Sequence, residues 1–444
     1  MRKKEWLTLA AACMLSLPAS AQTWNLKQCI DYAMEHNIQL QQNRISEKQA
    51  ETDLLSSKAQ MFPSLSFSTS QNVSNSPWRE TFDYMGETGS MTTSNTTYSG
   101  NYGLSANWTV WNGGRRKMNI ESSKISLEKS ELTSEAYANS IQEQILQFYV
   151  QILYAKESVK VNESTLEVAK AQRNRAKERV EVGDLSKADL AQLEAQVASG
   201  EYNVVNAKSQ VEKYKMQLKQ LLELTGSSDF DIATIEVTDQ QTMNLLPSVT
   251  NVYEQALLTR PEIRNSQLSI DAADLNVDIA KAGKLPTVSM NANIGSNTNS
   301  SNSKAWGNQF KQNWGNNVGL SVSVPILSQR QNRSAVEKAK YQLQASQLDL
   351  QNQQKQLYNT IEGYWIDGTT AQEQFKSSIT NVNSMQTSFN LLSEQFDLGL
   401  KNIVELMDSK NNLLQAEQSK LQSKYTVIMN EQLLKLYSGE STNL

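Results

Sequence analysis

The chain carries one pattern twice, and this internal repeat limits the folds it can adopt. The stretch ERVEVGDLSKADLAQLEAQV starts at Glu178, and EQFDLGLKNIVELMDSKNNL starts at Glu394. Both place a glycine after an apolar residue and then an acid followed by leucine, so Gly183 corresponds to Gly399 and Asp189 to Glu405. Self-similarity of this kind indicates a repeated structural unit.

Further matches extend the repeat over the whole chain. Tyr32–Leu40 corresponds to Gln255–Ile263, Pro63 to Pro286, and WTVWNGG from Trp108 to VPILSQR from Val324. The sequence therefore predicts two similar halves, residues 22–225 and 249–437, with a linker at 226–248 and a tail at 438–444. The first half has the longer loop, between Pro63 and Trp108.

Residues 1–21 have the pattern of a secretory signal peptide. The basic MRKK precedes a short apolar run, and Ala-Ser-Ala precedes Gln22, which predicts cleavage after Ala21. A lipoprotein attached through Cys13 is the weaker interpretation, because it leaves Ala-Ser-Ala unexplained.

Composition excludes several classes of function. Cys29 is the only cysteine after residue 21, so neither a disulfide framework nor a thiolate metal site is expected. His36 is the single histidine, and the net charge of −4 argues against a nucleic-acid partner. The sequence shows no nucleotide loop, metal cluster or catalytic triad, so we expect no enzyme, no catalytic residue, no cofactor and no metal.

Four segments alternate between apolar and polar residues. They lie at about 64–73, 98–111, 287–295 and 317–327, two in each half. A period of two with one apolar face predicts strands that lie half in an apolar phase. The residues expected to face lipid are Leu104, Trp108, Leu320 and Val322.

The helical segments follow a different period. A heptad seam runs through Ile141, Ile145, Phe148, Ile152, Ala155, Val159 and Leu166, with Asn162 interrupting it. It predicts a long helix from about Arg115 to Glu181, followed by a returning helix from about Lys187 to Leu224. Four strands cannot close a pore-sized barrel, and open edges cannot face lipid, so several copies must contribute to one barrel.

Two polar segments are expected to be loops on the cell exterior. Residues 71–97 and 296–316 are rich in Ser, Asn and Gly. Trp78, Tyr84, Trp306 and Trp314 are interspersed in them, and some of these aromatic residues are expected to mark the membrane interface.

In their order and spacing, these features resemble the TolC family of outer-membrane efflux and secretion channels. The resemblance rests on the repeat, on RPEI at Arg260, on the WTVWNGG and VPILSQR segments, and on the paired glycines. It implies a mainly α fold with a membrane β-barrel. A homotrimer would form a twelve-stranded barrel in the outer membrane of a Gram-negative bacterium, continued by a twelve-helix coiled-coil tunnel in the periplasm.

The resemblance also implies a function. The chain would be the channel tunnel of a tripartite efflux or type I secretion system, a passive export conduit gated at its periplasmic helix tips. Its partners would be outer-membrane lipid, a periplasmic adaptor and an inner-membrane pump of the RND or ABC type. The alternative is a periplasmic adaptor or coiled-coil scaffold of an export complex, because adaptors also contain helical hairpins.

The resemblance assigns roles to residues around the two glycines. Glu405 and Asp408 share a helix face and would form the pore gate. The positions assigned to contacts that hold the gate closed are Asp189, Lys401 and Phe396, although Phe396 departs from the family's best-known member, which has a tyrosine there. The positions assigned to adaptor docking are Gly183, Leu185, Gly399 and Leu400.

Overall fold

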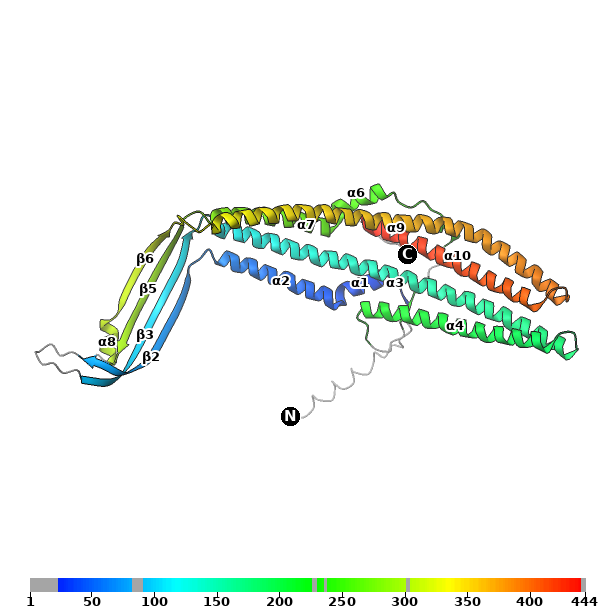
Figure 1. The fold of residues 1–444 in the computed structure, drawn as a ribbon, viewed down its shortest axis with the longest axis horizontal. Helices are drawn as coiled ribbons and strands as arrows, with labels where there is room; N and C mark the ends of the chain where they lie inside the picture. Colours follow the sequence, from blue (N-terminus) through cyan, green and yellow to red (C-terminus); the bar gives the residue numbers. More distant parts are fainter. Residues whose placement is uncertain (1–22, 82–90, 226–229, 235–237, 301–303, 441–444) are drawn as a thin grey trace, which may run out of the picture. The chain divides into compact units, whose positions relative to one another are not determined.

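The computed structural model describes residues 23–81, 91–225, 230–234, 238–300 and 304–440 (Figure 1). The expected signal peptide, Tyr84, and parts of the linker and tail lie outside these residues, as does the side chain of Trp78. The chain divides into two compact units. Unit 1 contains Met1–Ile45, Leu132–Arg264 and Gln351–Leu444, and unit 2 contains Ser46–Glu131 and Asn265–Leu350, so each unit draws on both halves of the sequence.

The two halves share the order helix, helix, strand, strand, helix, helix, to which the first half adds β1 and the second adds α8. The first contains β1 (Thr23–Trp24), α1 (Leu26–His36), α2 (Ile38–Ala59), β2 (Ser64–Thr81), β3 (Met91–Trp111), α3 (Arg115–Glu181) and α4 (Lys187–Leu221). After β4 (Asp231–Ile232) and α5 (Asp239–Thr242) follow α6 (Val249–Thr259), α7 (Pro261–Ala282), β5 (Thr287–Asn299), α8 (Trp306–Gln312), β6 (Gly315–Ser323), α9 (Gln331–Asp397) and α10 (Ile403–Ser438). The long helices α3 and α9 have 67 residues each, and α2 and α7 have 22 each.

Unit 2 contains an antiparallel sheet of four strands in the order β2-β3-β5-β6 (Figure 1). The register places Leu104 beside Phe67 and Ile294, and Trp108 beside Met290, which is itself paired with Leu320. Paired residues point to the same side of a sheet, so these apolar side chains share one face. Val322, beside Val288, continues that face.

The strands differ from the expected segments at their ends. β2 and β3 extend through most of the predicted loop at 71–97, and β5 extends to Asn299, so the prediction of loop there was wrong. Most of the added residues are Ser, Asn or Thr, so the apolar alternation that signals a strand is absent although backbone pairing continues. β6 ends at Ser323 rather than reaching 327, since Pro325 cannot donate a ladder hydrogen bond.

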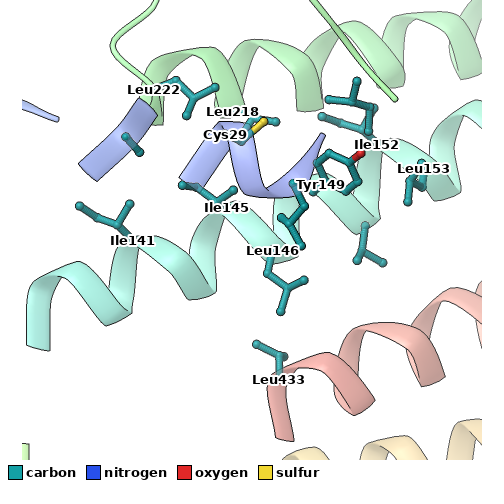
Figure 2. Close-up of a cluster of buried hydrophobic side chains, with 14 of the residues drawn as sticks. Cys29, Ile141, Ile145, Leu146, Tyr149, Ile152, Leu153, Leu218, Leu222 and Leu433 are labelled. Carbon is teal, nitrogen blue, oxygen red and sulfur yellow. The ribbon is translucent and has the colours of Figure 1, made fainter. Parts of the chain in front are cut away.

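The core of unit 1 forms where α1, α3, α4 and α10 meet (Figure 2). The central side chains that Figure 2 shows are Cys29, Ile141, Ile145, Leu146, Tyr149, Ile152, Leu153, Leu218, Leu222 and Leu433. Much of the predicted heptad seam is therefore buried, and Asn162, which interrupts it, donates from Nδ2 to the Ser158 carbonyl at 2.7 Å. Burial raises the pKa of Cys29 to about 12, so this thiol stays protonated.

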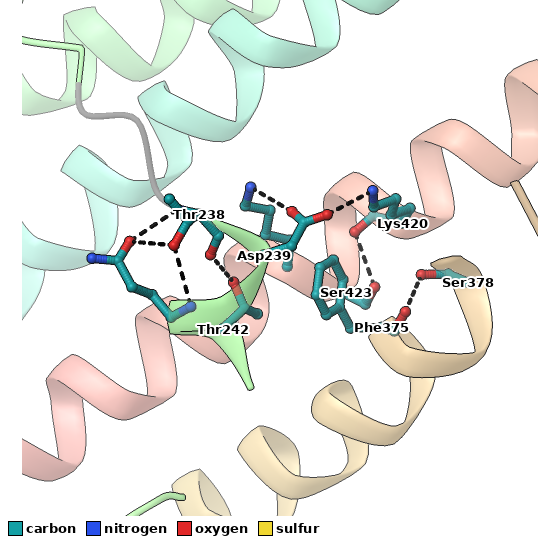
Figure 3. A network of polar contacts seen from close by, with 9 residues as sticks. Thr238, Asp239, Thr242, Phe375, Ser378, Lys420 and Ser423 are labelled. Carbon is teal, nitrogen blue, oxygen red and sulfur yellow. Dashed lines mark hydrogen bonds and ion pairs between the residues drawn. The ribbon is translucent and has the colours of Figure 1, made fainter. Parts of the chain in front are cut away.

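The short helix α5 is fixed to α10 by charge (Figure 3). Asp239 accepts from Lys420 at 2.9 Å and from Lys424 at 3.0 Å. Partial burial raises the pKa of Asp239, but the hydrogen bonds from the two lysines outweigh burial and lower it. Thr238 caps α5 by accepting from the Gln241 amide at 3.3 Å. The segment between the two halves is thus anchored on the last helix of the chain.

Candidate functional site at the paired helical turns

The turns between α3 and α4 and between α9 and α10, here called the tips, have the same backbone. Gly183 has φ +82° and Gly399 has φ +73°. In both tips the next amide reaches back to the preceding helix, Asp184 to the Arg179 carbonyl at 2.8 Å and Leu400 to the Gln395 carbonyl at 2.9 Å. This is a Schellman helix end, whose left-handed residue is usually glycine. An added Cβ would meet nothing within 4 Å at either glycine, so backbone conformation alone requires them.

The helices that leave the tips begin with matching caps. Ser186 accepts from the Asp189 amide at 3.1 Å, and Asn402 accepts from the Glu405 amide at 2.9 Å. Both acids therefore stand in a first helical turn, where the helix dipole favours negative charge. The equivalence of Asp189 and Glu405 reflects a shared structural position in addition to any role in gating.

The acids expected to form the gate differ in their surroundings. Glu405 is half-buried and pairs with Lys401 at 2.6 Å within the same tip. Asp408 is exposed. Asp189 and Lys401 make contacts within their own turns: Ser186 donates to the Asp189 carboxylate at 2.7 Å, and Lys401 pairs with Glu405.

Two arginines of α3 connect one tip to the other. Arg179 donates from Nη1 to the Phe396 carbonyl at 3.1 Å, and its guanidinium lies 5.6 Å from the centre of the Phe396 ring. Its Nε pairs with Asp184 at 2.8 Å, and Arg175 pairs with Asp397 at 3.2 Å. Phe396 thus takes part in a contact between the two hairpins through its carbonyl and its ring, and this contact needs no tyrosine hydroxyl. Sequence reasoning missed both arginines.

Beneath this contact the two hairpins share an apolar cluster. Its buried members are Ala176, Leu193, Phe389, Phe396, Ile403, Leu406 and Leu413. Leu185, expected to dock an adaptor, packs partly against this cluster, whereas Leu400 is 71% exposed. Val182 and Leu398, which precede the two glycines, are 80% and 73% exposed. The exposed apolar surface of the tips therefore contains Val182, Leu398 and Leu400, and only Leu400 was expected.

One buried cation lies among these helices. The side chain of Lys410 is buried with only 3% of the residue exposed, and its ammonium has no hydrogen-bond partner within the described chain. Burial lowers its pKa to about 8. Ser409 Oγ and Gln172 Nε2 are likewise buried without a partner. An unpaired buried charge opposes tight packing of the two hairpins.

The sheet offers a second candidate surface. The four residues expected to face lipid lie on its apolar face, with Leu320 69% and Val322 59% exposed and Leu104 and Trp108 exposed to a smaller extent. Across the described ranges no helix combines the length and hydropathy needed to cross a membrane. The same ranges contain no group of three or more His, Cys, Asp or Glu residues arranged to hold a metal.

These features define a protein built from repeated helical hairpins and a four-stranded sheet with one apolar face, and comparison with known proteins identifies its family. The model of the outer membrane efflux protein family matches residues 29–223 and 252–440, so the chain belongs to that family. The family is one of channels rather than enzymes, which favours the channel over the adaptor alternative. The predicted resemblance to TolC is confirmed.

Named relatives support the same assignment. The outer membrane protein TolC of Escherichia coli K12 is 25% identical over 297 residues, which cover 66% of this chain and 59% of the relative. The chain therefore spans less than two thirds of that relative's length. TolC of Vibrio cholerae is 19% identical over 437 residues, covering 96% and 93% of the two chains. The predicted location is confirmed: the protein lies in the outer membrane of a Gram-negative bacterium and extends into the periplasm.

A solved structure shares the fold. The structure of CusC superposes with a TM-score of 0.78 at 18% identity, covering 94% of this chain and 92% of that one. At this level of identity the match shows the fold alone.

Proposed function

We propose that three copies of the chain assemble into an outer-membrane channel that exports substrates passively from the periplasm. The observation that carries this proposal is the sheet of unit 2. It has one apolar face, and β2 and β6 stand at its edges. Unpaired edges cannot face lipid, so edges of neighbouring copies must pair. Four strands from each of three copies give a twelve-stranded barrel, continued by a tunnel of long helices.

The gate of this channel is proposed at the tips. Three copies would bring Glu405 and Asp408 together as a ring of carboxylates, which attracts cations and resists complete closure. The bonds from Arg175 and Arg179 to the end of α9 hold the α9–α10 hairpin against α3 in each protomer. Opening then requires that α9 and α10 move away from these arginines.

The proposed partners are a periplasmic adaptor at the tips and an inner-membrane pump of the RND or ABC type. Val182, Leu398 and Leu400 give the tips an exposed apolar surface that an adaptor hairpin would cover. Among the relatives, the AprF protein of Pseudomonas aeruginosa is named for alkaline protease secretion and the CzcC protein of Cupriavidus metallidurans for cobalt-zinc-cadmium resistance. Efflux and protein secretion therefore both remain within the proposed function.

A planar bilayer tests the channel directly. The full chain, purified from outer membranes in detergent, should insert as a trimer and give small, cation-selective conductance steps. Heat-denatured protein is the control. A preparation that binds bilayers but never conducts, under either polarity, would overturn the proposal.

A further inference from the structure

The short helix α8 lies against the outer part of the sheet and is fixed to β5 by hydrogen bonds (Figure 1). Ser296 donates from Oγ to the Phe310 carbonyl at 2.7 Å, Gln309 accepts from the Asn299 amide at 2.8 Å, and Asn313 donates to the Asn297 carbonyl at 2.6 Å. Ser296 and Thr298 are buried. The segment expected to be a loop is therefore an ordered helix at this point.

The register shows which face α8 covers. Ser296 is paired with Tyr102, and Ile294 is paired with Leu104 two residues away on each strand. Because side chains alternate between faces, Ser296 and Tyr102 point to the same side as Leu104 and Ile294. Helix α8 thus rests on the apolar face of the sheet, directly beyond its apolar rows.

An aromatic cluster joins α8 to that face. The Tyr102 ring lies 6.0 Å from Trp306 and 5.7 Å from Phe310, and Phe310 lies 6.2 Å from Trp314. Trp306 and Trp314 remain 55% and 56% exposed. Tryptophan and tyrosine with one apolar side and one polar group concentrate where a membrane meets water.

The dimensions fit a membrane boundary. From Tyr102 to Trp111, β3 spans about 30 Å at about 3.3 Å per residue. A strand tilt of about 40° reduces this to about 23 Å, close to the roughly 25 Å apolar band between the aromatic girdles of outer-membrane barrels. Trp108 and Trp111 mark one end of the band, and Tyr102 with α8 marks the other.

The charge of this segment is of one sign. Between Ser296 and Asn316 the charged residues are Lys304 and Lys311, with no Asp or Glu. Both lysines are exposed, and the Lys304 ammonium donates a hydrogen bond to Gln312 Oε1 at 2.6 Å, which positions it. Exposed tryptophans beside two lysines suit a lipid whose acyl chains meet the rings and whose anionic phosphate meets the ammonium groups.

We propose that α8, with Tyr102 and Trp314, is a binding site for anionic, phosphate-bearing lipid headgroups on the outer surface of the barrel. The site clamps the extracellular rim to the membrane surface. This inference rests on the proposed membrane face of the sheet, and the first experiment separates the two.

Spin labels measure the depth of α8 in the membrane. Cys29 is completely buried, so a cysteine introduced at Asn308 takes the label selectively in the full-length trimer. In nanodiscs containing phosphatidylglycerol, a label at position 308 should collide more with oxygen than with a water-soluble nickel chelate, and so should one at Leu320. A label at Ser105, on the polar face, should favour nickel. If position 320 favours oxygen and position 308 favours nickel, the lipid site is wrong and the membrane face stands. If neither favours oxygen, the proposed membrane face is wrong as well.

Lipid competition tests the lysines. Native mass spectrometry of trimers from mixed phosphatidylglycerol and phosphatidylcholine nanodiscs gives the preference for the anionic lipid. Lys311→Gln should lower that preference about fivefold, and Lys304→Gln with Lys311→Gln about twentyfold. The control Lys340→Gln removes an exposed lysine from α9 and should leave it unchanged. An equal loss in the control and the double variant would mean that only net charge matters and would overturn the site.

Discussion

At the scale of single residues, Lys410 is the clearest conflict between sequence pattern and environment. It occupies a buried place between Leu406 and Leu413 on α10, where the hairpins pack. Its pKa falls from 10.5 to about 8, because burial penalises the charged form. At neutral pH it therefore remains charged without a partner in the described chain, and it weakens the packing of the two hairpins.

Replacing Lys410 with methionine should stabilise the protein at neutral pH. A pKa shift of this size corresponds to about 3 kcal/mol. The folded state binds fewer protons than the unfolded state between about pH 8 and 10.5, so wild-type stability rises with pH in that window. The melting temperature of Lys410→Met should exceed that of wild type at pH 7, and the two should converge towards pH 10.5. Lys401→Met, which removes a partly exposed lysine from the same hairpin, is the matched control. A constant difference across the pH range would contradict the account.

The gate acids give a second prediction at this scale. Glu405→Ala with Asp408→Ala should lower cation selectivity several-fold in planar bilayers, because the proposed ring loses its charge. Lys401→Ala removes the 2.6 Å partner of Glu405 and should raise selectivity instead. Reversal potentials under a salt gradient measure both. Wild-type selectivity in the double variant would exclude a role in the gate. Glu405 would then only stabilise the start of α10, and Asp408 would be a solvated surface residue.

At the scale of elements, the tip glycines can be tested against a glycine of the helix interior. Alanine at Gly183 or Gly399 must adopt a left-handed backbone, which costs about 1 kcal/mol, although it meets no neighbouring atom. Amide exchange at Asp184 and Leu400 should become about fivefold faster. Gly363→Ala in α9 also has open space but needs no such backbone, so it should stabilise its helix and leave the tips unchanged. Equal effects at all three positions would exclude the backbone explanation.

The arginine contacts provide the second test of the hairpins. Arg179→Ala removes the bond to the Phe396 carbonyl, so the α9–α10 hairpin should separate more readily and single-channel conductance should rise. Arg173→Ala is the matched control, because Arg173 donates from Nε to the side chain of the neighbouring Asn174 at 3.0 Å, within its own helix. Unchanged conductance in Arg179→Ala would show that other contacts hold the gate.

The periodic pattern of the sequence predicted the helices and strands better than it predicted the contacts between them. The heptad seam indicated α3 over its full extent, because its period persists for many turns. Equivalence between the halves also held in the backbone, since Gly113 and Gln329 both have positive φ at the strand-to-helix turns. Arg179 was missed because its contact joins residues far apart in sequence. The sequence did contain a signal for this contact. The repeat pairs Arg179 with the uncharged Gln395, so the arginine is a departure from the equivalence of the two halves.

At the scale of the whole molecule, the proposed channel needs the apolar face of the sheet for membrane insertion and its edge strands, β2 and β6, for assembly. The apolar rows place Val318, beside Ala292 and Ala106, near the middle between Tyr102 and Trp111. Its neighbour Asn317 lies on the polar face, and both residues are exposed in the single chain. The sequence indicated this face by alternation, but only the register showed which residue lies at mid-depth.

Arginine at these adjacent positions should therefore have unequal effects. Val318→Arg would place a charge against the lipid midplane and cost about 2–4 kcal/mol per chain, whereas Asn317→Arg would face the water-filled interior and cost little. Leu320→Arg should lie between them, because Leu320 lies in the Trp108 row, closer to one boundary of the apolar band than Val318. The yield of detergent-stable trimer extracted from outer membranes, counted by native mass spectrometry, should fall in that order. Equal yields would place the membrane on the other face or on neither.

A wild-type chain recovered only as a monomer would mean that the edges of β2 and β6 do not pair between copies, and the proposed channel would have no closed wall.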